Sequence, residues 1–492
     1  MQIVFRADAS SRIGTGHVMR CLALAEALMA RDCIIHFICD DVPLFLLQLL
    51  EQKGITVHSI GVGGDSVADA DASKGIVSSL VSVDWLIVDH YDLDQNWEAQ
   101  LLPLVGRVMV IDDLANRVHQ CHLLLDQNFY LNADQRYGNW VPKGTKLLLG
   151  PKYALLGKAF SLARGEGESN AARSDSVKRV QVCFGGADPT NECMKTLEAL
   201  TPLMEGSGIA VEVIIGAACK HHDEIKSFVS RHNWADLVVN ASDIAQRMVM
   251  ADLAIGAAGS MSWERACLGL PSIAIAVAEN QILLGQHAAT KGVHLFLGWH
   301  AGVAVQNLRN AIALLVENES LRQSFARASR EVCDGNGVGR VVKALLGQGV
   351  SVRAAVERDA LTVFTWRNAI ENRRHSHDDQ AISWETHKPW FEAAVKNPDR
   401  IILIGEDAYG ELGVVRYDRK DGYWLVSIYL APERHGSGLG EPLLRAGSAW
   451  LRAQHPEIHE VRAEILVNNG ASHDVFLRAG YKPAFVTYLE AL

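Results

Sequence analysis

The chain opens with MQIVFRADASSRIGTGHVMRC, residues 1–21, and this stretch predicts the fold of the first part of the protein. Ile3-Val4-Phe5 is an apolar run typical of a buried parallel strand, and residues 19–29 carry apolar side chains at helical spacing. Gly14 and Gly16 lie between them, where glycine lets a backbone approach a ligand closely. We therefore expect a strand, a glycine-rich turn and a helix whose N-terminus favours anions.

The same alternation of strands and helices continues over about the first 340 residues. Further apolar runs predict strands at residues 34–39, 85–88, 108–111, 180–184, 211–215, 253–255 and 273–277. Alternation of this kind implies right-handed β-α-β units and parallel sheets. The polar stretch 165–176 is interpreted as a linker, with a surface loop inside one domain as the alternative. We predict an α/β fold with two Rossmann-type domains, 1–164 and 177–345, and a ligand cleft between them.

The order of elements changes beyond a second junction at residues 346–351. A helix-rich opening, residues 366–396, leads into strand-like runs at 401–404, 412–417 and 423–430. Turn sequences at 407–410 and 418–422 favour antiparallel pairing of these strands, and a further strand is expected at 461–466. This pattern predicts an α+β domain over residues 352–492.

The composition and net charge of the chain argue against some classes of partner and location. The net charge of −10 argues against nucleic-acid binding, which needs a basic surface. The sequence has no apolar run of roughly 18 residues and no signal peptide, so we expect no membrane association. Nine scattered cysteines without a CxxC pair fit reduced thiols and a cytoplasmic location. The expected partners are small-molecule substrates, and nothing in the sequence predicts an oligomeric state.

His17 is the candidate catalytic residue of the first domain. It follows the Gly14 and Gly16 turn at the start of the expected helix, facing the predicted cleft. Histidine changes charge near neutral pH, so it is a natural base for activating water. A tight turn with a helix-capping histidine is the alternative interpretation of this motif alone.

The second domain carries candidate nucleotide contacts. Gly185 and Gly186 end one expected strand, and Ser260 follows another, so backbone N–H groups and a hydroxyl are available for phosphates. Glu264 comes one helical turn after Ser260, where its carboxylate can accept from a ribose diol. Asn280 follows the strand expected at residues 273–277.

Two acidic or metal-like clusters are interpreted as non-metal sites. Asp112 and Asp113 end a strand without DxD spacing and are taken as structural or substrate-side residues. Cys219, His221 and His222 lie in a polar stretch with no acidic motif facing them in sequence. Asp89-His90 also ends a strand at the cleft and is a second candidate for sugar contact. We expect no metal cofactor.

The motifs of the first 340 residues resemble those of a known hydrolase family. RADASSxIGTGHxxRC, LIVDHY at 86–91, IDDLANR at 111–117, LLDQN at 124–128, FGGADP at 184–189 and Asn280-Gln281 occur in the expected order. This series resembles the UDP-2,4-diacetamido-2,4,6-trideoxy-β-L-altropyranose hydrolases of pseudaminic acid biosynthesis. The resemblance implies a GT-B fold, metal-free release of UDP, His17 as catalytic base, Glu264 on the ribose and Asn280 near the sugar. We expect the substrate to contact Arg6, Asp8, Gly14, Gly16, Arg20, Gly185, Gly186, Ser260, Glu264 and Asn280.

The last 140 residues resemble the GNAT N-acetyltransferases. A strand leads into APERHGSGLG at 431–440 and then into an apolar helix, followed by NGAS at 469–472 and AGY at 479–481. A glycine-rich turn before a helix can hold a pyrophosphate through backbone N–H groups. The resemblance implies acetyl-CoA as cosubstrate, held by Leu430, Arg434, His435, Gly436, Gly438, Leu439, Gly440 and Asn469. LTVFTWRN at 361–368 and ISWETHKPWF at 382–391 look like the branch that acetylates the 4-amino group of a UDP-linked deoxysugar in the same pathway.

The catalytic groups of this second enzyme are left open by the sequence. Many GNAT enzymes carry a tyrosine, as general acid for the CoA thiolate, where this chain has Phe476. Tyr481 or a water can take that role, or the thiolate can leave unprotonated, and Glu464 is a base candidate. The rival interpretations are a glycosyltransferase or UDP-sugar 2-epimerase on the GT-B fold, and a GNAT domain that binds without turnover.

Overall fold

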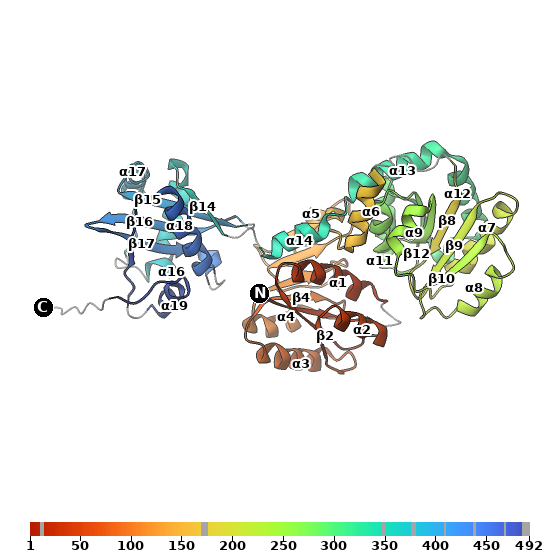
Figure 1. The fold of residues 1–492 in the computed structure, drawn as a ribbon, viewed down its shortest axis with the longest axis horizontal. Helices are drawn as coiled ribbons and strands as arrows, with labels where there is room; N and C mark the ends of the chain where they lie inside the picture. The colour runs from red at the N-terminus through yellow and green to blue at the C-terminus, as the bar shows by residue number, and fades with distance from the viewer. Residues whose placement is uncertain are drawn as a thin grey trace. The chain divides into compact units, whose positions relative to one another are not determined.

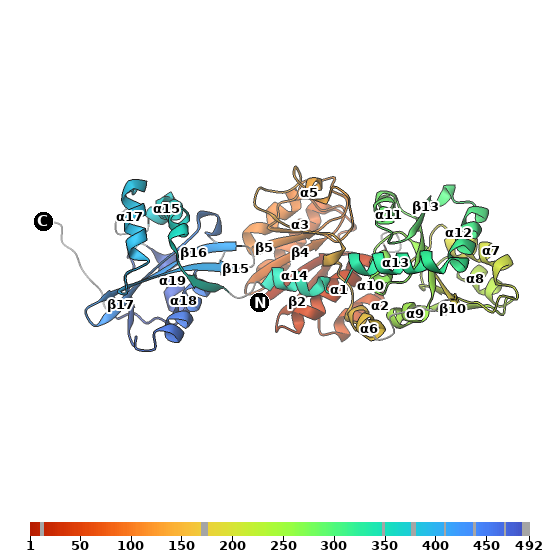
Figure 2. The ribbon, with the colours of Figure 1, turned by 90° about the horizontal axis from the view of Figure 1, so that it is seen from above.

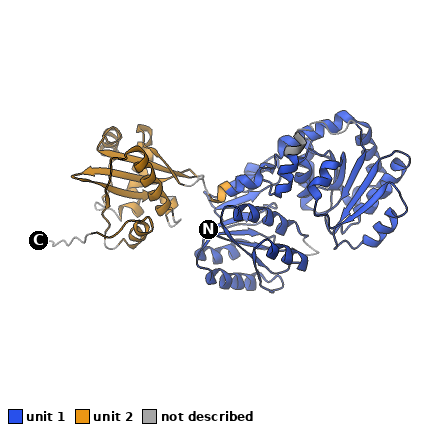
Figure 3. Ribbon diagram, viewed as in Figure 1, with its two compact units in different colours: residues 1–342 blue, residues 343–492 orange. Residues whose placement is uncertain are grey.

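The computed structural model describes residues 1–9, 14–168, 176–346, 350–374, 380–407, 410–435, 439–466 and 469–484. The chain forms two compact units, residues 1–342 and 343–492 (Figure 3). Among the described residues, no helix has the length and apolar character needed to cross a membrane.

The first unit begins with a seven-stranded parallel sheet in the order β3-β2-β1-β4-β5-β6-β7. Its strands are β1 (Gln2–Ala7), β2 (Ile34–Cys39), β3 (Thr56–Ser59), β4 (Val83–Asp89), β5 (Val105–Ile111), β6 (Leu123–Asp126) and β7 (Lys146–Leu149). The helices and 3-10 turns are α1 (Gly16–Met29), α2 (Leu44–Gln52), α3 (Ser66–Ser79), α4 (Gln95–Leu101), η1 (Leu102–Leu104), α5 (Ala133–Arg136) and η2 (Pro151–Tyr153). Helices α3 and α4 pack on one face of the sheet, and α1 lies on the other (Figure 1). Since both faces are covered, the middle of each central strand is apolar, as in Ile3-Val4-Phe5 and residues 85–88.

The second part of this unit is a six-stranded parallel sheet in the order β10-β9-β8-β11-β12-β13. Its strands are β8 (Arg179–Cys183), β9 (Ala210–Ile215), β10 (Ala235–Val239), β11 (Leu253–Ala257), β12 (Ser272–Ala276) and β13 (Leu295–Trp299). The helices and turn are α7 (Glu192–Met204), α8 (His222–Val229), α9 (Ile244–Met250), α10 (Met261–Cys267), α11 (Asn280–Thr290), η3 (His300–Gly302), α12 (Val305–Glu317), α13 (Glu319–Val332) and α14 (Gly337–Leu346). The predicted pair of parallel α/β sheets is confirmed (Figure 2).

The segment expected to link the two sheets is partly helical. Helix α6 (Lys158–Glu168) extends into the polar stretch that begins at residue 165. Phe160 and Ala163 on this helix are buried against Met248 and Trp263 of the second sheet's helices. These apolar contacts stabilise the helix. They could not be predicted from the polar stretch, because the contacting residues are distant in the sequence. Residues 169–175 lie outside the described part of the chain.

The second unit is an α+β fold around a five-stranded sheet in the order β14-β15-β16-β17-β18. The strands are β14 (Ser351–Ala354), β15 (Arg400–Asp407), β16 (Gly410–Lys420), β17 (Tyr423–Leu430) and β18 (Val461–Ala463). The helices and turns are η4 (Glu357–Asp359), α15 (Ala360–Asn368), α16 (Ile370–Arg373), α17 (Trp384–Ala394), η5 (Pro432–Arg434), α18 (Gly440–Gln454) and α19 (Gly470–Arg478). Helices α15 and α17 cover one face, and α18 and α19 cover the other. The first four strands pair antiparallel, as the turn sequences predicted.

Two features of this unit differ from the sequence expectation. The edge strand β14 was not predicted, because it has only four residues, and they form no apolar run and are partly or fully exposed. The strand expected over residues 461–466 ends at Ala463, because its pairing with β17 stops at Val426.

Candidate active sites

Several of the residues predicted for the first unit lie at the two places where the strand order of a sheet reverses. In the first sheet this place is between β1 and β4, and in the second between β8 and β11. Open parallel sheets bind ligands at the carboxyl ends of their strands at such a point. His17 follows β1, Gly185 and Gly186 follow β8, and Ser260 follows β11. The topology therefore gives each of these loops a position suited to a ligand.

His17 is the second residue of α1 and is hydrogen-bonded to a buried carboxylate. Its Nδ1 lies 2.6 Å from Oδ1 of Asp89, the last residue of β4, whose side chain is fully buried. Arg20, one helical turn after His17, donates to both oxygens of Asp89, from Nε at 2.6 Å and from Nη2 at 2.5 Å. The three side chains form one buried cluster at the carboxyl end of the sheet.

The two carboxyl groups of this region have pKa values displaced in opposite directions. Burial opposes ionisation of Asp89, but the charge of Arg20 and the hydrogen bonds from Arg20 and His17 outweigh it and hold its pKa well below the ordinary value. Burial raises the pKa of Asp113, although Arg20 lies 4.0 Å away. Oδ1 of Asp113 is buried and has no hydrogen-bond partner among the described residues. Groups with strongly displaced pKa values in a cleft are typical of active sites.

Tyr91 and Asn280 connect this cluster to the second sheet's side of the unit. The Tyr91 ring packs edge-on against the His17 ring, with centroids 4.6 Å apart. Asn280, the first residue of α11, donates from Nδ2 to the Tyr91 hydroxyl at 3.3 Å. The structure therefore brings together His17 and Asn280, two of the predicted site residues. Tyr91 was missed, although it directly follows Asp89-His90 at the end of β4.

A second chain of hydrogen bonds links the two sheets. Trp263 of α10 donates from Nε1 to Oδ1 of Asn128 at 2.8 Å, and Asn128 donates from Nδ2 to Asp113 at 3.2 Å. All three side chains are buried. The residue after Trp263 is Glu264, so the nucleotide candidate is one peptide bond from this connection.

Arg6, Asp8 and Arg20 contact protein groups in this structure. Arg6 donates to Asp8 at 2.6 and 2.9 Å and also binds Asp69, and only 1% of its surface is exposed. His90 lies 3.0 Å from the other side of the Asp8 carboxylate. These contacts brace the turn after β1 and account for the charges of Arg6 and Asp8 without a ligand.

The glycine turn of the first domain faces the serine turn of the second. Gly14 has a φ of +79°, a left-handed conformation that favours glycine. A Cβ placed on Gly16 would lie 4.0 Å from the Ser260 hydroxyl. The intervening residues 10–13 lie outside the described part of the chain.

The candidate nucleotide contacts come from two turns of the second sheet. Gly185 has a φ of +92°, and the Gly186 carbonyl accepts from the Gly216 amide at 2.9 Å. Glu264 lies in the first turn of α10 and is only partly exposed, with no hydrogen-bond or ion-pair partner among the residues that the structure describes. Burial raises the pKa of Glu264 to about 7. An unpaired carboxyl at this position is available to a ligand.

The candidate acetyl-CoA region lies where β17 and β18 separate. The two strands pair from Trp424 with Val461 to Val426 with Ala463, and β17 then continues to Leu430 paired with β16 alone among the described strands. Among the described residues, no strand pairs with the β18 side of β17 beyond Val426, so this edge is suited to another extended chain. The Leu430 carbonyl accepts from Asn372 at 2.9 Å.

The residues predicted to hold acetyl-CoA around the glycine-rich turn each contact a different part of the unit. His435 lies 3.3 Å from the Leu430 carbonyl, and Arg434 donates to Asp407 at 2.6 Å. A Cβ on Gly440 would lie 3.0 Å from Val475, so glycine suits the start of α18, directly after Leu439. Asn469 is buried and caps α19 by accepting from the Ser472 amide at 3.0 Å. Gly436 and Gly438 lie outside the described residues.

The residues considered for proton transfer in this unit differ in burial: Tyr481 is partly buried against the core, and Glu464 is exposed. Phe476 is buried among the residues under α18, and the Tyr481 ring packs edge-on against it with centroids 5.0 Å apart. Burial raises the pKa of Tyr481. Glu464 follows the last paired residue of β18. No single proton donor is assigned by this geometry.

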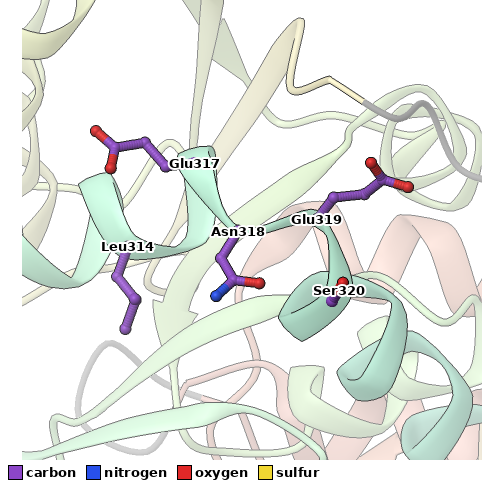
Figure 4. Close-up of a pocket in the computed structure, with 5 residues that line it drawn as sticks. All are labelled: Leu314, Glu317, Asn318, Glu319 and Ser320. Atoms are coloured by element: carbon purple, nitrogen blue, oxygen red, sulfur yellow. The ribbon is translucent and has the colours of Figure 1, made fainter.

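One pocket of the first unit is lined by none of the candidate site residues. It lies at the junction of α12 and α13 and is lined by Leu314, Glu317, Asn318, Glu319 and Ser320 (Figure 4). Its two carboxylates disfavour a phosphate ligand. Within the described ranges, no group of three or more His, Cys, Asp or Glu side chains is arranged to hold a metal ion.

Residues 350–482 match the model of the acetyltransferase (GNAT) domain. The second unit thus carries a GNAT domain, in agreement with the sequence resemblance.

Three relatives align with the first unit or with more of the chain. The UDP-2,4-diacetamido-2,4,6-trideoxy-beta-L-altropyranose hydrolase of Campylobacter jejuni is 24% identical over 300 residues, 59% of this chain and 97% of that protein. A spore coat polysaccharide biosynthesis protein of Bacillus subtilis is 24% identical over 354 residues, which cover 70% of this chain and 98% of that protein. An uncharacterized protein of Methanocaldococcus jannaschii is 22% identical over 98% of this chain and 97% of its own length. The predicted resemblance to the hydrolase is confirmed.

A solved structure supports the fold of the first unit. UDP-GlcNAc 2-epimerase from Neisseria meningitidis, bound to UDP-GlcNAc, superposes with a TM-score of 0.50 at 12% identity, covering 70% of this chain and all of that one. The predicted fold class, a GT-B-like pair of Rossmann-type domains followed by an α+β GNAT domain, is confirmed.

Proposed function

We propose that this chain is a bifunctional enzyme of pseudaminic acid biosynthesis. One part hydrolyses a UDP-linked 2,4-diacetamido-2,4,6-trideoxy sugar to the free sugar and UDP. The other transfers an acetyl group from acetyl-CoA to the 4-amino group of the UDP-sugar precursor. The observation that carries the first activity is the pairing of His17 with buried Asp89 beside Tyr91 and Asn280. The likeness to the Campylobacter hydrolase supports the substrate.

In the hydrolase part, His17 takes a proton from a water whose oxygen attacks the anomeric carbon. A bond forms between that oxygen and the carbon, and the bond from the carbon to the diphosphate oxygen breaks. UDP leaves with the electron pair, so no acceptor other than water is needed. Asn280 contacts the sugar, Glu264 accepts from the ribose hydroxyls, and Gly185, Gly186 and Ser260 bind the phosphates. We propose that this step needs no metal.

In the acetyltransferase part, the pantetheine arm lies along the free edge of β17 near Leu430. The diphosphate of acetyl-CoA lies at the turn before α18, which includes Arg434, His435, Leu439 and Gly440. The 4-amino nitrogen attacks the thioester carbonyl, a C–N bond forms and the C–S bond breaks. The proton of the amine goes to water or to a protein base, and CoA leaves as the thiolate.

The domain organisation that accompanies this proposal has three parts. Residues 1–164 supply His17, residues 177–345 supply the nucleotide contacts, and residues 352–492 carry acetyl transfer. The proposed binding of two small molecules needs neither nucleic acid nor a membrane.

The hydrolase part is tested with the purified chain and the UDP-linked 2,4-diacetamido sugar alone. We expect stoichiometric UDP and free sugar, because water is the acceptor. A glycosyltransferase would release UDP only with a sugar acceptor, and a 2-epimerase would return a UDP-linked product. Either result would contradict the proposal.

A further inference from the structure

The carboxylate beneath His17 has a role that goes beyond stabilising the fold. We propose that Asp89 is a positioning residue, which fixes the His17 ring with its proton on Nδ1 and so leaves Nε2 as the basic nitrogen. This inference rests on the proposed function, because it explains how His17 acts as a base there.

The distances around Nδ1 determine the tautomer. Nδ1 of His17 lies 2.6 Å from Asp89 Oδ1 and 3.2 Å from Arg20 Nη2. If Nδ1 carried only a lone pair, it would face a carboxylate oxygen at 2.6 Å with no proton between the two atoms, which is repulsive. If Nδ1 carries the proton, the same contact is a short charge-assisted hydrogen bond. The proton therefore belongs on Nδ1, which then has no lone pair to accept from Arg20, and Arg20 Nη2 donates to Asp89 Oδ1 at 2.5 Å instead.

The Asp89 carboxylate is itself held in one orientation. Arg20 donates to both of its oxygens, and the Cys21 thiol donates to Oδ2 at 3.4 Å. Its side chain is fully buried, so water does not compete for these contacts. A carboxylate fixed by several donors also fixes the plane of a histidine bonded to it, as in other sites where the second ring nitrogen orients the first.

The free side of the ring is consistent with this role. Nε2 of His17 has no hydrogen-bond partner among the described residues. The ring also contacts Tyr91, whose hydroxyl is bonded to Asn280. The ring is thus held by a carboxylate at Nδ1 and by an aromatic ring, while Nε2 is left for a water.

The argument predicts a specific effect of Asp89→Asn. Arg20 presents only donors, so the amide oxygen of asparagine would turn toward the guanidinium. The amide NH₂ would then face Nδ1 of His17 and favour the opposite tautomer, with the proton on Nε2. A ring protonated on Nε2 cannot take a proton from water there. We expect kcat to fall by about 10²–10⁴-fold, with KM and UDP affinity nearly unchanged.

The most direct test is nitrogen NMR of the ¹⁵N-histidine-labelled wild-type chain, at a pH of about 8.5 where ordinary histidine is neutral. The His17→Asn variant identifies the His17 signals by their loss. We expect a protonated-type Nδ1 and an unprotonated-type Nε2. A protonated Nε2 in the wild type would overturn the inference, and this measurement does not require any variant of Asp89 to fold.

The variant series separates positioning from simple stability. Asp69→Asn is the matched control, because Asp69 is also buried and bonded to an arginine, Arg6, but does not touch His17. We expect the His17 tautomer to change in Asp89→Asn and to stay unchanged in Asp69→Asn. A folded Asp89→Asn protein with unchanged tautomer or near wild-type kcat would contradict the inference. If the wild type released no UDP but showed the expected tautomer, the proposed function would fail while the positioning would stand.

Discussion

At the scale of single residues, the active-site proposal depends on His17. Its ring is the one histidine that the structure places beside both Asp89 and Tyr91 in the part of the chain described. We expect His17→Asn to lower kcat for UDP release by about 10²–10⁴-fold, the usual loss for a general base. UDP should still bind, because the proposed nucleotide contacts come from the second sheet.

Calorimetry of UDP binding and steady-state kinetics check this prediction together. A His17→Asn protein with near-normal kcat would remove His17 from the mechanism. Loss of UDP binding in the same protein would instead indicate a role in nucleotide binding.

Glu264 gives a prediction about pH. Its pKa is raised to about 7 by burial, so lowering the pH below this value protonates the carboxyl and weakens its proposed hydrogen bonds to the ribose hydroxyls. UDP affinity should therefore fall by up to about tenfold for each pH unit below about 7. Glu264→Ala should also weaken UDP binding by about 1.5–3 kcal/mol at pH 8.

Glu264→Gln is the control for this pH dependence, since the terminal phosphate of UDP also titrates near pH 6. The part of the pH dependence that belongs to Glu264 should be absent from Glu264→Gln. Identical profiles of UDP affinity against pH for the two proteins would rule out its contact with the ribose.

The candidate residues could be predicted from the sequence where a local motif marks them. His17 follows a glycine-rich turn, and Asn280 follows a strand, so each has a local signal. Asp89 was ranked second and Tyr91 was not singled out, because their importance comes from contacts with residues 72 positions earlier and 189 positions later. Arg20 was expected on the substrate, but its bonds to Asp89 show only when the strands are placed side by side.

At the scale of elements, one glycine shows how closely the second sheet is packed. Gly256 of β11 pairs with Cys183 of β8, and a Cβ on Gly256 would lie 2.2 Å from the Cys183 carbonyl oxygen. Gly256→Ala must push these strands apart, so we expect a loss of about 1–3 kcal/mol of stability. We expect the first unit of the Gly256→Ala variant to unfold at a lower temperature than that of the wild type, as measured by thermal unfolding.

The comparison is Gly75→Ala in α3, where a Cβ meets nothing within 4 Å. Alanine favours a helix over glycine by about 0.5–1 kcal/mol, so this change should leave stability equal or higher. Equal melting temperatures for the two variants would show that the approach of β8 to β11 is not as tight as the structure indicates.

Elements with strong apolar patterns were predicted well, and those that depend on tertiary contacts were not. The buried strands β2, β4 and β5 are long apolar runs, so their positions follow from the sequence. β14 is a four-residue edge strand without an apolar run, held by pairing with β15, and α6 is held by contacts with the second sheet's helices. Such elements lack a local signal, because their stabilising partners are distant in the sequence.

At the scale of the whole molecule, the two units have separate hydrophobic cores. We therefore expect residues 1–346 and 350–492 to fold when produced as separate chains. The first should release UDP from the diacetylated substrate, and the second should consume acetyl-CoA with the 4-amino substrate. Circular dichroism and the two assays check this, and a piece that folds only in the presence of the other would contradict it.

The central claim is that acetylation and hydrolysis are consecutive steps, in that order. A pocket built for a neutral acetamide should reject the charged ammonium of the precursor, since burying an unpaired charge is costly. The direct measurement is UDP release from the UDP-linked 4-amino sugar by the intact chain, with and without acetyl-CoA, followed by mass spectrometry. We predict little UDP without acetyl-CoA, and with it CoA first, then UDP and the free diacetamido sugar. Equal rates of UDP release under the two conditions would contradict the ordering, and no CoA release under either would contradict the acetyltransferase activity.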